Sequence, residues 1–253
     1  WAEVFLRQLN EWDSGMELPV VSKYKILKDE RIWAEKYLMD LFFQLQIPRE
    51  RWDKVPVIMF QPFGGWFMTT SVTLTGRELD INVANELALA LQKSGAIVIQ
   101  VRAQQEPAIQ GAIQLPNVSV RKIIALLSKC NLFISVDSFL QHAGACIGKR
   151  GVVLWGSTSP NSNGYKENIN LNYVKEKNLC LTPNCLRPVW GLPDFISVDS
   201  FNESPLWKCP YDWVCMEYKV SDILESVMSL INQKESNREI DEKNKKEEVS
   251  KNV

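Results

Sequence analysis

An acidic residue, a hydroxyl residue and the chain's only histidine stand close together in the sequence, as Asp137, Ser138 and His142. They follow Leu132 to Val136, a short apolar run of the kind that is buried in a parallel sheet. The helix after this strand is expected to begin at Ser138, with Gln141 completing a capping box. Ligands of open α/β sheets bind outside the carboxyl ends of the strands, where helix N-termini favour phosphate. The pattern therefore predicts a phosphate-containing ligand at this edge.

Each of these residues also has a simpler interpretation. Asp137 is equally explained as a dipole partner for the following helix, a role worth about 1 kcal/mol at most. A lone histidine is more often a structural residue than a catalyst. We expect His142 to orient the site or to bind phosphate, and not to act as the base.

Two further loops are expected at the same edge of the sheet. Gly64 and Gly65 follow the first long apolar strand, and paired glycines let backbone N–H groups approach a phosphate. Gly156 and Thr158 follow the strand after the histidine, where hydroxyls and free amides can hold a phosphate or a sugar. The alternatives are an ordinary glycine turn and an ordinary capped turn.

Strands that alternate with helices predict an α/β fold with a Rossmann-like, doubly wound parallel sheet. The expected strands are Val55 to Phe60, Ala96 to Val101, Leu132 to Val136 and Val152 to Trp155. The expected helices are Trp1 to Trp12, Asp29 to Leu45, Ile81 to Lys93, Val118 to Cys130 and Val220 to Ile231. Between Pro160 and the last helix the pattern is irregular, and so long an irregular region needs a functional or covalent reason.

The composition excludes some classes of protein. The chain has 253 residues, of which 45% are hydrophobic, so it can bury a sizeable core. A formal net charge of -1 argues against a nucleic-acid surface, because phosphate neutralisation needs clustered positive charge. No apolar run is long enough to span a bilayer, so we expect at most peripheral membrane association.

Four late cysteines form two close pairs within the irregular region. Cys180 and Cys185 are spaced C-x4-C, and Cys209 and Cys215 are spaced C-x5-C. Four thiols in two pairs can hold a tetrahedral metal and so cross-link a long loop. Zinc is the default structural metal and iron is the other candidate. Free thiols and disulfides are the alternatives.

The segment around the histidine resembles the C-terminal domain of the family 9 glycosyltransferases, the lipopolysaccharide heptosyltransferase family. The residues that match its hallmark are Asp137, Ser138, His142, Ala143, Ala145, Gly148, Lys149, Gly156, Thr158 and Pro160. Phe139 stands where the family usually has glycine, which limits how closely a phosphate can approach the backbone. The family also often carries a lysine after the glycine loop, and Arg77 is the nearest cation here.

The resemblance implies a glycosyltransferase of the two-domain GT-B architecture, represented by its nucleotide-sugar-binding half. It implies that Asp137 and Ser138 face the nucleotide-sugar, and that transfer requires no metal cofactor because loop amides, helix N-termini and a cation hold the diphosphate. The implied donor is ADP-heptose or a related nucleotide-sugar. The implied acceptor is the lipopolysaccharide core or another glycan, or a protein, as in the autotransporter heptosyltransferases. The implied location is the cytoplasm, at the cytoplasmic face of the inner membrane.

The resemblance also suggests a domain division. Residues 1–54 are expected to be a helical remnant of the acceptor half and a connector, and residues 55–233 the nucleotide-sugar-binding domain, with a cysteine-rich insertion at 178–216. Residues 234–253 are charged and lack apolar periodicity, so we expect a disordered tail. Because the chain begins at Trp1, we expect a preceding part to be missing.

Two rival functions stay open at this point. One is a different Rossmann-type sugar-nucleotide enzyme such as an epimerase, although no Gly-x-Gly-x-x-Gly motif or suitably placed Tyr-x-x-x-Lys pair is present. The other is a truncated binding module that retains donor affinity but does not transfer sugar.

Overall fold

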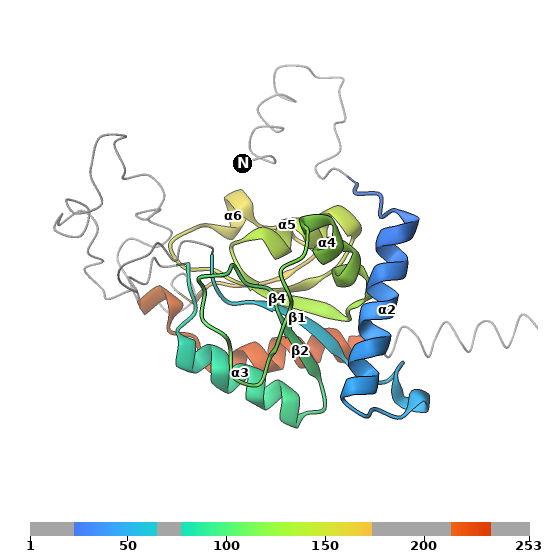
Figure 1. Ribbon diagram of the computed structural model, residues 1–253. Helices are drawn as coiled ribbons and strands as arrows, with labels where there is room; N and C mark the ends of the chain where they lie inside the picture. Colours follow the sequence, from blue (N-terminus) through green and yellow to red (C-terminus); the bar gives the residue numbers. More distant parts are fainter. Residues whose placement is uncertain (1–22, 65–76, 174–213, 234–253) are drawn as a thin grey trace, which may run out of the picture.

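The computed structural model describes residues 23–64, 77–173 and 214–233, which form one α/β unit (Figure 1). Its strands are β1 Val57–Gln61, β2 Ile97–Gln100, β3 Ile113–Gln114, β4 Leu132–Val136, β5 Gly151–Leu154 and β6 Ile169–Leu171. Its labelled helices are α2 Lys28–Gln44, α3 Ile81–Lys93, α4 Val120–Lys129, α5 Phe139–Ile147 and α6 Pro160–Asn163, with short 3-10 turns η1 Arg49–Arg51 and η2 Val214–Met216. Residues 220–233 form a further helix.

All neighbouring strands of the sheet pair in parallel, in the order β3-β2-β1-β4-β5-β6. This is the strand order of the doubly wound dinucleotide-binding fold, in which the chain reverses direction across the sheet between β1 and β4. Ligands of such sheets bind at the carboxyl edge at this reversal. The predicted Rossmann-like α/β fold is therefore confirmed, and the switch point lies directly beside Asp137.

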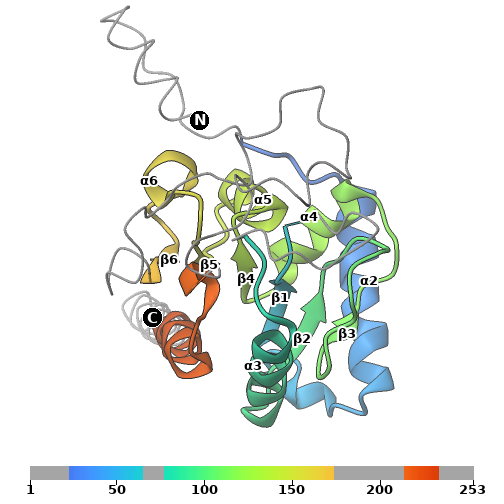
Figure 2. The ribbon, with the colours of Figure 1, turned by 90° about the vertical axis from the view of Figure 1, so that its left-hand side faces the viewer.

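Helices cover both faces of the sheet because successive side chains of a strand point to opposite faces. Ile58 and Phe60 of β1 belong to a core that includes α3 and the 220–233 helix. Met59 of β1 belongs to the opposite core, with residues of α2, α4 and α5. Figures 1 and 2 show these two helix layers on either side of the strands.

Helix α2 shares its core with the sheet. Its buried residues Ala34, Leu41 and Phe42 pack in the same cluster as those of α4. A polar contact reinforces this, since Arg121 of α4 donates to the carboxylate of Glu30. The expected domain division at residue 54 stays a prediction, and it would separate α2 from a core to which the helix contributes.

Most expected elements match the structure closely, but the expectation that the irregular region begins directly after Pro160 is wrong. The helix Ile81–Lys93 and the strand Leu132–Val136 have the expected bounds. The chain after Pro160 forms α6 and then β6, which pairs with β5. The expected helix at Trp1 to Trp12, the 178–216 insertion and the 234–253 tail lie outside the described residues, apart from the short stretch that includes η2.

Candidate functional site

The carboxyl ends of β1, β4 and β5 bring three loops to one edge of the sheet. Gln61 ends β1, and Asp137 directly follows β4. Gly156 to Thr158 come shortly after β5, and Gly156 is buried. A backbone hydrogen bond of 2.9 Å from Leu79 N–H to the carbonyl oxygen of Pro62 also ties the approach to α3 to the loop after β1.

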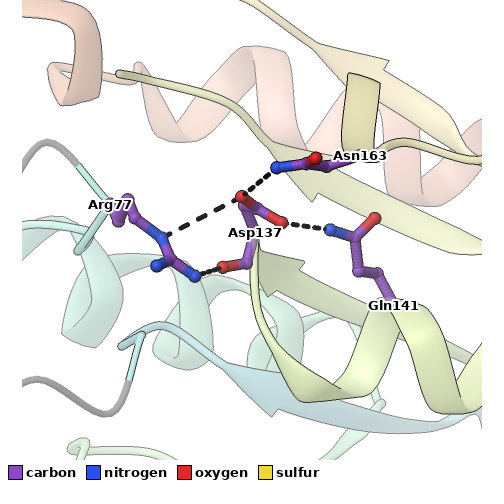
Figure 3. Close-up of polar contacts among 4 residues, drawn as sticks. All are labelled: Arg77, Asp137, Gln141 and Asn163. Carbon is purple, nitrogen blue, oxygen red and sulfur yellow. Dashed lines mark hydrogen bonds and ion pairs between the residues drawn. The ribbon is translucent and has the colours of Figure 1, made fainter. Parts of the chain in front are cut away.

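Asp137 is the centre of the polar contacts at this edge, as Figure 3 shows. Gln141 of α5 donates its side-chain amide to Oδ1 at 2.5 Å, and Asn163 of α6 donates to Oδ2 at 3.3 Å. The guanidinium of Arg77 lies with Nε 4.0 Å from Oδ2, and its Nη2 donates to the Asp137 backbone oxygen. Residues far apart in the sequence therefore converge on one buried carboxylate.

This arrangement compensates the cost of burying a charge. Asp137 is only 4% exposed, and an isolated buried carboxylate is unfavourable unless it is paired and hydrogen-bonded. Arg77 supplies the opposite charge, and the two amides supply hydrogen bonds. A carboxylate can accept about four hydrogen bonds, and the two amides use two of them. Asp137 thus holds three segments in register and keeps capacity for a further donor.

The predicted capping box at the start of α5 is wrong. Ser138 occupies the N-cap position, but its side chain makes no capping hydrogen bond. In a capping box the Gln141 side-chain oxygen would accept from the Ser138 N–H, whereas here the Gln141 amide nitrogen donates to the charged Asp137 carboxylate. A hydrogen bond to a charged acceptor is stronger than one between neutral groups. Gln61, at the end of β1, accepts from the Leu140 N–H at 2.9 Å. A side chain from the neighbouring strand therefore caps α5 and ties its N-terminus to the switch point.

Several buried polar atoms near this edge have no hydrogen-bond partner among the described residues. Ser157 and Thr158 are 1% and 2% exposed, and both of their hydroxyl oxygens are unpaired there. The amide oxygens of Gln141 and Asn163 are likewise unpaired in that part of the chain. An unpaired buried polar group costs about 1–3 kcal/mol, so each needs an explanation such as a bound ligand or water.

Of the two glycines expected to meet a phosphate, Gly64 lies among the described residues and Gly65 does not. A Cβ at Gly64 would lie 3.7 Å from the Arg77 Cβ and 3.8 Å from Glu78 Oε1, which are ordinary contacts. Space alone therefore does not require glycine at this position. Gly64 does lie beside Arg77, which touches Asp137.

His142 is exposed on the first turns of α5. Its Nδ1 is 2.9 Å from the hydroxyl oxygen of Tyr165, and the two rings meet edge to face with centroids 5.6 Å apart. Desolvation of the ring by the surrounding protein lowers the pKa of His142, although part of the side chain is exposed. The carboxylate of Asp137 opposes this shift and Arg77 adds to it. His142 therefore lies within the electrostatic reach of the Asp137 cluster.

The expected metal site lies largely outside the described residues. Cys180, Cys185 and Cys209 are not among them. Cys215 lies within η2, is 8% exposed and packs in the apolar core. Within the described ranges no group of three or more histidine, cysteine, aspartate or glutamate side chains could hold a metal. The four-cysteine site stays a prediction.

Over residues 23–64, 77–173 and 214–233, no helix combines the length and the apolar character needed to cross a bilayer.

Comparisons with known proteins indicate a family for part of the chain. The sequence model for glycosyltransferase family 9 (heptosyltransferase) matches residues 85–187. This match confirms the resemblance to family 9. The matched region contains Asp137, His142 and Thr158. A search of curated protein sequences finds no match to the chain.

Two solved structures share the fold. A family 9 glycosyl transferase from Veillonella parvula DSM 2008 has a TM-score of 0.53 at 16% identity, covering 90% of this chain and 58% of that chain. The ADP-heptose LPS heptosyltransferase II of E. coli has a TM-score of 0.52 at 14% identity, covering 87% of this chain and 56% of that one. At these identities the likeness concerns the fold alone. The chain spans somewhat more than half the length of either structure.

The region that the family 9 model matches contains candidate functional residues that the sequence analysis missed or assigned to another role. Gln141 is four residues after Asp137, a helical spacing that would have indicated their contact. Asn163 lies in a segment without apolar periodicity, and nothing in the sequence indicates its contact with Asp137. Lys149, one of the hallmark residues, donates to the backbone oxygens of Ser128 and Cys130 at the end of α4, so it has a structural role there.

Proposed function

We propose that this chain is the donor-binding part of a glycosyltransferase and binds a nucleotide-diphosphate sugar at the carboxyl edge of β1, β4 and β5. The observation that carries the proposal is the convergence of Arg77, Asp137, Gln141 and Asn163 on the switch point of the sheet. The family 9 model matches residues 85–187, which include Asp137, Gln141 and Asn163, and this supports the proposal independently.

The chemistry that the proposal assigns to this edge is stabilisation of negative charge. Sugar transfer from a nucleotide-diphosphate donor leaves charge on the departing diphosphate, and preorganised donors lower the barrier by stabilising that charge. Arg77 supplies a cation, and the unpaired hydroxyls of Ser157 and Thr158 supply hydrogen-bond donors. Ser138 and the helix start behind it lie at the same edge. The proposal assigns no step to a metal cofactor, and it assigns no general base.

For the sugar we propose a heptose, with ADP-heptose as the first donor to test. The fold is shared with a protein named as an ADP-heptose LPS heptosyltransferase, and the family model carries the description heptosyltransferase. We propose a glycan or protein acceptor, met at the cytoplasmic face of the inner membrane.

The test is a thermal-shift screen of ADP, ADP-sugars and other nucleoside diphosphates. A ligand at a hundredfold excess over its dissociation constant stabilises the folded state by about 2.7 kcal/mol. We expect ADP or an ADP-sugar to stabilise the wild type and to have a weaker effect on Arg77→Gln. Arg51→Gln, an exposed change in η1, is the control and should bind as the wild type does. If no nucleoside diphosphate stabilises the wild type, the proposal is wrong.

A second candidate function is donor binding without transfer. The chain covers 58% and 56% of the two structures that share its fold, so the likeness does not extend over their whole length. Under this alternative the protein binds the donor, but a transfer assay at saturating donor and acceptor shows no product. Turnover at a normal enzymatic rate would reject it.

A further inference from the structure

We propose that Tyr165 is a positioning residue for His142: its hydroxyl donates to Nδ1 of the imidazole, so that Nε2 carries the proton and faces the diphosphate of the donor. This inference rests on the proposed donor site for its ligand. The contact itself is independent of that site.

The pair is well defined in the structure. The Tyr165 oxygen lies 2.9 Å from Nδ1, which is a normal hydrogen-bond distance. The rings meet at 81°, an edge-to-face arrangement that restricts rotation of the imidazole. Among the described residues Nε2 of His142 has no hydrogen-bond partner, and the side chain is exposed. The nitrogen that Tyr165 does not occupy is therefore the one open to a ligand.

The backbone of Tyr165 is anchored to the sheet. Asn170 of β6 donates its side-chain amide to the Tyr165 backbone oxygen at 2.9 Å. The indole Nε1 of Trp155, a fully buried residue, donates to the Asn170 side-chain oxygen at 2.8 Å. A chain of hydrogen bonds thus runs from the core through Asn170 to the backbone of Tyr165. Tyr165 can hold the ring in place because its own position is set by β6.

The protonation state of the imidazole decides what it can do. In a neutral ring one nitrogen donates and the other accepts, so a hydroxyl that donates to Nδ1 leaves the proton on Nε2. Desolvation lowers the pKa of His142, with Arg77 acting in the same direction and Asp137 against it. The ring is therefore neutral near pH 7. It offers a phosphate oxygen one directed N–H donor at a position where Arg77 already supplies charge.

The chain's single histidine makes a direct test possible, because every imidazole signal in an NMR spectrum belongs to His142. A long-range ¹H–¹⁵N spectrum at neutral pH reports which ring nitrogen is protonated. In the wild type we expect the proton on Nε2 and the ¹⁵N shift of a hydrogen-bonded acceptor at Nδ1. In Tyr165→Phe the Nδ1 signal should move to that of an acceptor without this bond. Tyr37→Phe on α2 is the control and should leave the spectrum unchanged.

Addition of ADP supplies the second readout. We expect ADP to shift Nε2 in the wild type, and Tyr165→Phe to bind ADP about three- to tenfold more weakly, as the loss of one positioned hydrogen bond implies. In a His142→Gln background, Tyr165→Phe should cause no further loss, because Tyr165 acts through the ring. A merely structural tyrosine would weaken binding in both backgrounds.

The outcomes separate this inference from the proposed function. A wild-type ring protonated at Nδ1 while neutral, or an imidazole spectrum that Tyr165→Phe leaves unchanged, would overturn the positioning role whether or not ADP binds. Binding of ADP without any shift at Nε2 would overturn the ligand contact. Failure of every nucleoside diphosphate to bind would count against the donor site, while the spectrum of the free protein would still decide whether Tyr165 sets the ring.

Discussion

At the scale of single residues, the charge on Asp137 sets the behaviour of its neighbours. Its carboxylate receives the side-chain amides of Gln141 and Asn163 and pairs with Arg77. The same charge favours protonation of His142, whereas Arg77 and desolvation disfavour it. Opposite charges near one imidazole make its pKa a sensitive measure of the cluster.

We predict that Asp137→Asn lowers the pKa of His142 further and that Arg77→Gln raises it. The wild-type pKa should itself lie below the ordinary value of 6.5, because desolvation of the ring is the largest contribution. Removing the carboxylate removes an influence that raises the pKa, and removing the guanidinium removes one that lowers it. An NMR titration of the single histidine measures all three values, with Asp40→Asn on α2 as the control. Shifts of opposite sign would contradict the described cluster.

The residues of the site differ in how well the sequence predicts them. Asp137 could be located because it follows a fully buried apolar strand, and the end of such a strand is a local feature. The sequence indicates Arg77 only as the nearest cation, since its contact with Asp137 spans 60 residues. The spacing of Gln141 from Ser138 predicts a capping box, but its amide donates to the buried Asp137 carboxylate, and sequence spacing does not show which charged groups are buried.

At the scale of elements, α5 can carry its site residues only because it lies close to β4. A Cβ at Gly144 would collide with the Phe133 ring and lie 2.9 Å from the Lys149 backbone oxygen. Gly151 of β5 has a similar close contact with Phe133. Two glycines thus make room for one large side chain, which sets the height of α5 above the sheet.

We predict that Gly144→Ala destabilises the protein by about 1–3 kcal/mol, the usual cost of overpacking a core. Because α5 would have to move away from β4, donor binding should weaken as well. Urea unfolding measures the first effect and calorimetry the second. Cys146→Ala, at a half-buried position of the same helix, should change both values much less. A Gly144→Ala variant as stable as the wild type would show that α5 can shift without cost.

Helix α2 provides a second prediction at this scale. The Leu27 N–H, 2.8 Å from Glu30 Oε2, is the largest cause of a lowered pKa of Glu30, and Arg121 adds to it. A carboxyl with a lowered native pKa contributes stability above its ordinary pKa of about 4.5 and loses it as the pH falls through the native value. Urea midpoints measured from pH 6 to pH 3 should therefore fall less steeply for Arg121→Gln than for the wild type. Identical slopes would show that the contact between α2 and α4 contributes nothing measurable to the free energy of unfolding. Arg51→Gln is the control.

The elements that the sequence predicts best are the ones with a strong local pattern. The helix α3 and the strand β4 have the expected bounds because each shows an uninterrupted apolar period or run. The strands β3 and β6 have two and three residues and are only partly buried, so neither leaves a recognisable period. They pair at the outer edges of the sheet through tertiary context, which the sequence does not display.

At the scale of the whole molecule, the all-parallel sheet explains why distant segments form one site. The order β3-β2-β1-β4-β5-β6 places the ends of β1 and β4 side by side although the strands lie far apart in the sequence. The β1–β4 register pairs Gln61 with Ser135, which brings the loop after β1 beside Asp137. The topology therefore predicts the location of the site once the strand order is known.

The cysteine-rich region gives a prediction for the complete chain. We predict that the purified protein contains about one zinc or iron atom, held by Cys180, Cys185, Cys209 and Cys215, because paired thiolates suit a tetrahedral metal. Elemental analysis measures the metal content, and Cys180→Ser should reduce it. Cys130→Ser, which changes a buried thiol outside this set, is the control. A metal-free wild type prepared without chelators would leave the four residues as thiols or disulfides.

A calorimetric titration of ADP into the wild type, Asp137→Ala and the exposed control Asp40→Ala decides whether the cluster around Asp137 forms the donor site. We predict saturable binding of one ADP to the wild type and to the control. We predict binding about tenfold weaker or worse for Asp137→Ala, because Arg77, Gln141 and Asn163 lose the carboxylate that positions them, and a hydrogen bond to a charged group is worth about 1.5 kcal/mol or more. Equal ADP affinity in all three folded proteins, or no binding to any of them, would contradict this prediction.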